Sequence, residues 1–183
     1  MSNKDCEYCR INIGSKKAKK LYEDELFIAF LSPKPVSDGH IVIIPKKHHT
    51  ILEQIPDFEI DKLFMLANKL SIAVFDSLRV GGTNLIINNG LAAGQEIPHV
   101  ALHIIPRNQG DNISYDWEPK KLNNEEISTV ELRLKEGSSN VGAFEKKEEK
   151  PVDLDEKPEE KEKKKISDKD KENYLVKQLE RIP

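Results

Sequence analysis

Short apolar segments separated by proline, glycine and asparagine occupy the first 110 residues of the chain. These segments are rich in isoleucine, valine and phenylalanine, and turn signals lie between them. Asp38-Gly39 and Asn89-Gly90 are the clearest of those signals. The pattern therefore predicts four strands, at residues 26–31, 40–44, 84–88 and 99–105.

A long helix is predicted between the second and third of these strands. Apolar residues recur there at spacings of three and four, which places them on one face of a helix. Asp57 is the expected N-cap, and Gly81-Gly82 is the expected stop. The strands and this helix together predict an α+β domain over residues 1–110. The residues of the helical face are Ile60, Leu63, Phe64, Ala67, Leu70, Val74 and Leu78.

The rest of the chain divides into three parts. Residues 111–144 are an extension that contains a predicted short helix, residues 123–135. Residues 145–170 carry dense charge of both signs and bury too little apolar surface to offset their ordering entropy, which predicts a disordered linker or a solvated helix. Residues 171–183 are predicted to form a docking helix or a frayed tail, the docking stripe being Leu175, Leu179 and Ile182.

The composition narrows the function classes. A formal net charge of -3 disfavours a general nucleic-acid binder, because such proteins are usually basic. No apolar run approaches the roughly 18 residues of a membrane span, and the N-terminal residues lack the apolar stretch of a signal peptide. The chain has two cysteines, which form a CxxC and no disulfide framework. A reducing cytoplasm is therefore the expected setting.

Residues 94–107 carry the strongest functional signal. Side chains of a strand alternate between its two faces. His99, Ala101 and His103 therefore share one face, and the apolar residues between them point into the core. Two histidines that frame a small residue are an odd choice for packing alone.

This segment resembles the signature of the histidine-triad (HIT) superfamily, in which three histidines alternate with apolar residues. Gly94-Gln95 before it and Pro106-Arg107 after it match the family as well. Residues 35–48 resemble a second block of the family, and the resemblance runs in unbroken order over residues 5–108. It implies an α+β, HIT-like fold, in which an antiparallel five-stranded sheet with a long helix dimerises into a ten-stranded sheet. Spare apolar residues of the predicted helix fit a buried homodimer face: Met65, Leu66, Ile72 and Phe75.

One position departs from the family. Ala101 stands where the middle histidine attacks the α-phosphate of a nucleotide and forms a covalent nucleotidyl-histidine. Alanine has no lone pair, so this route is lost and we expect little turnover. Ala101 is either an engineered replacement in an active enzyme or a natural feature of an inactive relative. The completeness of the rest of the motif favours the engineered origin.

The resemblance assigns roles to the neighbouring residues. His103 matches the third histidine, which lies beside the transferred phosphate and the leaving group, and can donate to developing negative charge. Asn88 matches a polar residue that contacts the phosphate or the ribose. Ser32 stands where the family usually has an acidic or amide residue on the ribose hydroxyls, which puts that contact in doubt. Gly94 and Gln95 match the loop whose main-chain N–H groups cradle the α-phosphate.

The CxxC pair, Cys6 and Cys9, has a spacing common in zinc sites. In the metal-bearing branch of the superfamily, the positions of His48 and His99 complete a structural Cys2His2 zinc site. His49 is an alternative ligand through a one-residue register shift, and a free CxxC is the alternative to any metal. His40 is expected to be a structural histidine with its hydrogen bonds satisfied.

Three functions are compatible with this pattern. The leading interpretation is a hydrolase or transferase acting at the α-phosphate of a nucleotide, with an AMP-like ligand, a nucleoside phosphoramidate, an adenylated amine or a dinucleoside polyphosphate as substrate. The second is a non-catalytic nucleotide-binding sensor or interaction protein, which requires Ala101 to be native. A polynucleotide-end repair enzyme has little support, because the C-terminal charge is mixed rather than basic.

Overall fold

The computed structural model describes residues 5–138 and 141–142. Five antiparallel strands form one sheet in the order β1-β2-β3-β5-β4. The predicted parts at 145–170 and 171–183 lie outside the described residues. The strands are β1 (Lys20–Glu23), β2 (Phe27–Leu31), β3 (Ile41–Pro45), β4 (Gly82–Ile87) and β5 (Leu102–Arg107). The helices are α1 (Glu7–Asn12), α2 (Asp57–Leu78) and α3 (Asn124–Gly137), with short 3-10 turns at Leu52–Gln54 and Leu91–Ala93.

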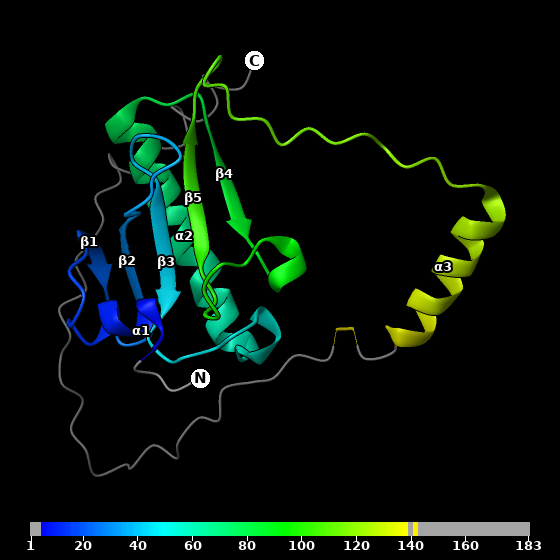
Figure 1. Cartoon of the computed structure of the whole chain (residues 1–183), viewed down its shortest axis with the longest axis horizontal. Helices are drawn as coiled ribbons and strands as arrows, with labels where there is room; N and C mark the ends of the chain where they lie inside the picture. The colour runs from blue at the N-terminus through cyan, green and yellow to red at the C-terminus, as the bar shows by residue number, and fades with distance from the viewer. Residues whose placement is uncertain (1–4, 139–140, 143–183) are drawn as a thin grey trace, which may run out of the picture. The chain divides into compact units, whose positions relative to one another are not determined.

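The sheet has an apolar core on each face. Helix α2 lies behind the sheet in Figure 1, and α1 lies in front of it. Alternate residues of β5 face α2. Leu102 and Ile104 pack there with the fully buried Leu63 of the helix. Ala101 belongs to the opposite core, together with residues of α1. Truncating a residue such as Leu63 to alanine is expected to cost about 2–5 kcal/mol in stability. Helix α2 therefore covers one face of the sheet firmly, and Ala101 lies on the other face.

All four predicted strands exist, but the last begins later than expected. The prediction of a strand from residue 99 is wrong for His99, Val100 and Ala101, because β5 starts at Leu102. The backbone N–H of Val100 donates to the carbonyl of His49 (2.8 Å) rather than to a neighbouring strand. Pro106 lies within β5, where the hydroxyl of Ser37 donates to its carbonyl at 2.7 Å. No β3 residue pairs with Pro106, so its missing N–H costs no ladder bond on that side.

Both predicted ends of the long helix need correction. Pro56 is the N-cap, because its carbonyl accepts the first helical bonds, and Asp57 is already helical. The helix ends at Leu78, followed by Arg79 in the left-handed conformation, whereas Gly82 begins β4. The Gly39 turn passes close to this end, since a Cβ there would lie 2.3 Å from Leu78 Cδ1.

The division of α2 into core and spare residues was only partly right. Leu66 and Phe75, expected to be spare, pack against the core. Phe64, expected in the core, is 45% exposed, and Met65 is 57% exposed as expected. Two elements were missed, because β1 is exposed throughout and α1 has only six residues.

The predicted short helix is confirmed as α3. A capping box begins it, in which the Asn123 side chain accepts from the Glu126 N–H and the Glu126 carboxylate accepts from the Asn123 N–H. Every residue of α3 is exposed. Within the described part of the chain, no helix has both the length and the apolar character needed to cross a membrane.

Candidate active site and metal centre

A cavity of about 530 Å³ brings the predicted site residues together. His99, Ala101 and His103 all line it, which confirms that these alternate positions face one space. Ile105 extends the same face of the chain toward the end of β5. The predicted nucleotide contacts also line the cavity: Ser32, Asn88, Gly94 and Gln95. The residue pattern thus located the pocket even though His99 and Ala101 precede the strand.

Ala101 lies in the middle of this row. Its side chain is 8% exposed and packs with the apolar core on that face of the sheet. His99 on one side is 1% exposed and His103 on the other is partly buried. A methyl group between two imidazoles contributes neither a nucleophile nor a hydrogen bond.

His40 orients His103. The backbone N–H of Val36 donates to Nδ1 of His40 at 3.2 Å, so neutral His40 carries its proton on Nε2. That proton is donated to Nδ1 of His103 at 3.0 Å. Burial lowers the pKa of His40 to about 4, with the charge of His103 a smaller cause, and burial also lowers the pKa of His103. Neutral His103 therefore carries its proton on Nε2, as an N–H donor.

The Gln95 side chain fastens the loop between β4 and β5. Its Oε1 accepts from the Gly90 N–H at 2.8 Å, and its Nε2 donates to the carbonyls of Thr50 (2.7 Å) and Ile97 (3.0 Å). The main-chain N–H groups of Gly94 and Gln95 bond inside the loop, to Leu91 and Gly90. Gly94 and Gln95 line the cavity, but their N–H groups are used inside the loop, so the expectation that these two N–H groups cradle a phosphate is wrong. The Gln95 side chain holds the loop to the segment that follows β3.

Asn88 and Ser32 lie at the rim. Asn88 Nδ2 donates to the Gly94 carbonyl at 3.2 Å, which leaves its Oδ1 as an acceptor. The Ser32 hydroxyl accepts from the Lys34 N–H at 3.2 Å and can still donate. Lys34 and Glu96 form an exposed ion pair of 3.7 Å, which contributes little in water.

Four ligand atoms meet beside this cavity. Cys6, Cys9, His48 and His99 place one ligand atom each within 4.8 Å of all the others. Cys9 Sγ lies 3.2 Å from His48 Nδ1 and 3.6 Å from His99 Nδ1, and Cys6 Sγ lies 3.5 Å from His99 Nδ1. The edges of a tetrahedron around zinc with S and N ligands are roughly 3.3–3.8 Å, so the donor set fits such an ion. His49 does not belong to the cluster.

Neighbouring groups and burial set the protonation of the cluster's ligands. His99 Nε2 donates to the Pro45 carbonyl at 3.0 Å, which leaves Nδ1 as the lone pair that faces the thiols. Burial lowers the pKa of His99 to about 4, which keeps the ring in the neutral form that a metal needs. Burial, then the hydrogen bond and charge of Cys6, raises the pKa of the Cys9 thiol to about 11. A bound cation reverses that shift, because it stabilises the thiolate directly.

Sequence reasoning missed several lining residues, among them Glu7, Tyr8 and Tyr115. Burial raises the pKa of Tyr8 to about 12, so its hydroxyl stays protonated. Tyr115 lies eight residues beyond the end of β5, in a segment without helix or strand. Only its proximity in sequence to the last strand could have pointed to it.

The HIT domain family matches residues 14–110, more than half of the chain. The chain belongs to the HIT family. The adenylylsulfatase HINT3 of Arabidopsis thaliana is 39% identical to this chain over 107 residues, which cover 58% of this chain and 54% of the relative. The same HIT fold occurs in a crystal structure of a HIT family member from Bacillus subtilis, with a TM-score of 0.68 and 30% identity over 72% of this chain and 96% of the other. A zinc-bound histidine triad family protein from Mycobacterium smegmatis has a TM-score of 0.59 and 29% identity over 74% and 99% of the two chains.

Proposed function

We propose that this chain binds a nucleoside phosphate in the cavity, with the α-phosphate between Ala101 and His103, and turns it over very slowly. The observation that carries the proposal is the row of His99, Ala101 and His103 along one wall of a 530 Å³ cavity. The activity expected of this chain with a histidine at position 101 is hydrolysis or transfer at the α-phosphate through a nucleotidyl-histidine. Ala101 removes that intermediate, since nothing at this position can attack phosphorus.

The remaining residues can still bind and polarise such a ligand. The His40 Nε2–H donates to His103, and the His103 Nε2–H is then free to donate to a phosphate oxygen or to the leaving group. Glu96 and Ile97 line the cavity, and within the described residues their main-chain N–H groups have no hydrogen-bond partner. These N–H groups are the candidates to hold the remaining phosphate oxygens. Binding without turnover is therefore the expected behaviour.

The substrate panel follows from the family and from the relatives. Candidate substrates are adenosine 5′-phosphoramidate, adenylated amines and dinucleoside polyphosphates. Adenylyl sulfate is added because the Arabidopsis relative is an adenylylsulfatase. Calorimetry with AMP measures binding by the chain as it stands. Hydrolysis of each candidate is compared between this chain and its Ala101→His variant. A gain of several orders of magnitude in Ala101→His is expected, and the absence of both AMP binding and a gain contradicts the proposal.

The same variant decides between the two origins of Ala101. An engineered replacement implies that Ala101→His restores an enzyme in one step. A natural nucleotide sensor or interaction protein, the second candidate function, implies AMP binding but no activity of Ala101→His on any substrate. The observation that favours the sensor is Ala101 itself, because a site without the attacking imidazole can bind a nucleotide but cannot form the covalent intermediate.

We further propose that the Cys2His2 cluster holds structural zinc. The S and N donors and their separations favour zinc over harder cations. Elemental analysis of the purified chain is expected to give one zinc per chain. Thiols that react freely with a chromogenic reagent before chelation, together with absence of metal, contradict this.

We also propose a homodimer, which the resemblance to the HIT superfamily implies. Phe64 and Met65 of α2 and Leu85 of β4 are exposed in the single chain, and a partner can cover them. Light scattering coupled to size exclusion is expected to give twice the 20.9 kDa chain mass. A monomer at all concentrations contradicts this assembly.

A further inference from the structure

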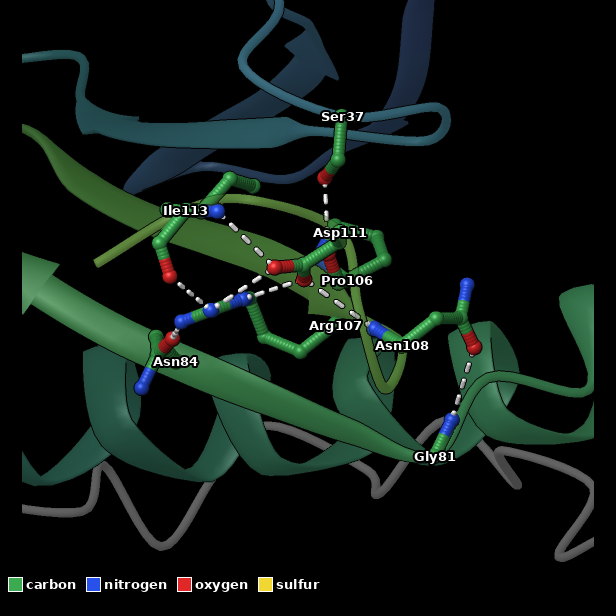
Figure 2. Close-up of polar contacts among 8 residues, drawn as sticks. All are labelled: Ser37, Gly81, Asn84, Pro106, Arg107, Asn108, Asp111 and Ile113. Atoms are coloured by element: carbon green, nitrogen blue, oxygen red, sulfur yellow. Dashed lines mark hydrogen bonds and ion pairs between the residues drawn. The ribbon is translucent and has the colours of Figure 1, made fainter.

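Arg107 anchors the segment that follows β5. Figure 2 shows its guanidinium between Asp111, Asn84 and Ile113. Nε donates to Asp111 Oδ2 at 2.6 Å and Nη2 to Asp111 Oδ1 at 3.0 Å, which is a bidentate pair. Nη1 donates to Asn84 Oδ1 at 2.5 Å on β4, and Nη2 also donates to the Ile113 carbonyl. One side chain thus ties the irregular segment to two strands.

Asp111 reinforces this anchor from the other side. Its carboxylate accepts from the N–H of Asn108 at 3.1 Å and of Ile113 at 3.0 Å, so it shapes the turn as well as binding the arginine. The Arg107 guanidinium holds the pKa of this carboxyl well below its usual range. The pair is therefore charged across the neutral and mildly acidic range.

The anchor ends in an aromatic residue of the cavity wall. The Arg107 Cζ atom lies 5.5 Å from the centre of the Tyr115 ring, which is cation–π distance. Tyr115 lines the cavity together with Ile105 and Ile86, whereas Arg107 does not line it. Since His103, Ile105 and Arg107 alternate along one face of β5, the Tyr115 ring closes the end of the row opposite the metal centre. Four of its N–H bonds are already used within the chain, so Arg107 has little capacity left for a phosphate.

We infer that Arg107 is a positioning residue that holds Tyr115 as a flat wall of the cavity, and that this wall packs against a planar ring of the ligand. The inference rests on the proposed nucleotide binding. The ring can be the base of the nucleotide or an aromatic leaving group beyond His103. Both sources offer the same chemistry to Tyr115, Ile86 and Ile105, namely a flat apolar surface.

Three ligands separate the sources in calorimetry: AMP, ribose 5-phosphate, and the tryptamine phosphoramidate of AMP. Tyr115→Ala is expected to weaken ring-dependent binding by about tenfold. If the wall receives the base, the loss occurs with AMP and not with ribose 5-phosphate. If it receives the leaving group, the loss occurs with the phosphoramidate alone. Equal affinity of Tyr115→Ala and the unmodified chain for all three ligands overturns the inference.

The anchor is tested with Arg107→Lys and Asp111→Asn, which keep size but break the bidentate pair. Both are expected to reproduce most of the Tyr115→Ala loss, and Arg107→Lys adds little on top of Tyr115→Ala, because the three act as a unit. Arg133→Lys, on exposed α3, is the matched control. Fluorine NMR of 3-fluorotyrosine protein, assigned with Tyr115→Phe, reports the ring directly without ligand.

The outcomes separate the two claims. No binding of any ligand by the unmodified chain contradicts the proposed function, whereas a Tyr115 fluorine signal that moves in Arg107→Lys and Asp111→Asn still supports the anchor. Normal binding with an unchanged fluorine signal in both variants overturns the anchor alone. If Arg107→Lys does not fold, Asp111→Asn supplies the same measurement from the other partner.

Discussion

The two ends of the Ala101 row are held in different ways. At one end, His99 is buried and belongs to a four-residue cluster whose members come from three segments of the domain. At the other end, Arg107 holds Tyr115 through side-chain bonds to an irregular segment. The first end depends on a metal-ligand set and the second on one guanidinium. The cavity between them is therefore expected to be rigid near the cluster and adjustable near Tyr115.

The largest expected effect breaks the metal end. Cys9→Ser removes one ligand of the buried cluster and is expected to lower the free energy of unfolding in the presence of zinc by more than about 4 kcal/mol. Urea unfolding with and without added zinc measures the loss. The unmodified chain stripped of metal is the control, because its unfolding should match that of Cys9→Ser. Identical midpoints of the two zinc-loaded proteins contradict a structural metal.

The next effect concerns the link between that end and the loop that joins β4 to β5. Gln95→Glu keeps the shape but loses the N–H donors to Thr50 and Ile97. Two lost bonds of about 0.5–1.5 kcal/mol each predict a loss of roughly tenfold in AMP affinity, and zinc is also held less tightly. Calorimetry measures the affinity for AMP, and competition with a zinc-binding dye measures the affinity for zinc.

Gln54→Glu is the matched control for this change. Gln54 Oε1 accepts from the Thr50 N–H at 2.7 Å, and a glutamate can accept in the same way. It should leave both affinities unchanged. A loss in Gln54→Glu as large as in Gln95→Glu would show that any charge near Thr50 disturbs the site, and the link through Gln95 would be wrong.

The sequence predicted the metal end better than the Tyr115 end, and the reason is physical. Alternation is a local pattern that places His99, Ala101 and His103 on one face without knowledge of the fold, and the CxxC spacing indicates a metal site in the same local way. The choice of His48 and His99 as the other ligands came from the family resemblance. The bond between His40 and His103 depends on the pairing of β3 with β5, where Val42 lies opposite His103. Tyr115 is even less accessible, since no periodicity marks a residue in a segment without regular structure.

The prediction of α2 also shows that local patterns do not determine which residues are buried. Spacing identified α2, but it did not separate Leu66, which packs on the core, from Met65, which is exposed. A helix presents a continuous range of directions, and only the position of the sheet decides which apolar residues are covered. The predicted ends of the helix were wrong for a related reason. Pro56 begins α2 and Arg79 follows its end through backbone geometry, without a side-chain cap that the sequence could reveal.

A smaller effect tests the middle of the row. The pKa of His40 is lowered to about 4, so the unfolded chain binds a proton that the folded chain does not as the pH falls from about 6.5. The contribution of His40 to stability is thus present above the unfolded pKa and lost toward about pH 4. NMR of the imidazole rings in zinc-loaded protein should show His40 neutral at about pH 5.5 and protonated on Nε2. A His40 ring that titrates near its ordinary pKa contradicts the burial of His40, and a proton on its Nδ1 contradicts the hydrogen bond from Val36.

The smallest effect sharpens the Tyr115 end. Asn84 accepts one bond from Arg107, whereas Asp111 accepts two and carries the opposite charge. Asn84→Ala therefore leaves the bidentate pair in place, and the Tyr115 ring should keep its position. We expect less than about a twofold change in affinity for ring-bearing ligands, since the lost bond is one of several and its donor can turn to water. Asp111→Asn measured in parallel sets the scale. If Asn84→Ala weakens binding as much as Asp111→Asn does, β4 rather than the carboxylate pair positions Tyr115, and the adjustable end of the cavity is tied to the sheet as firmly as the metal end.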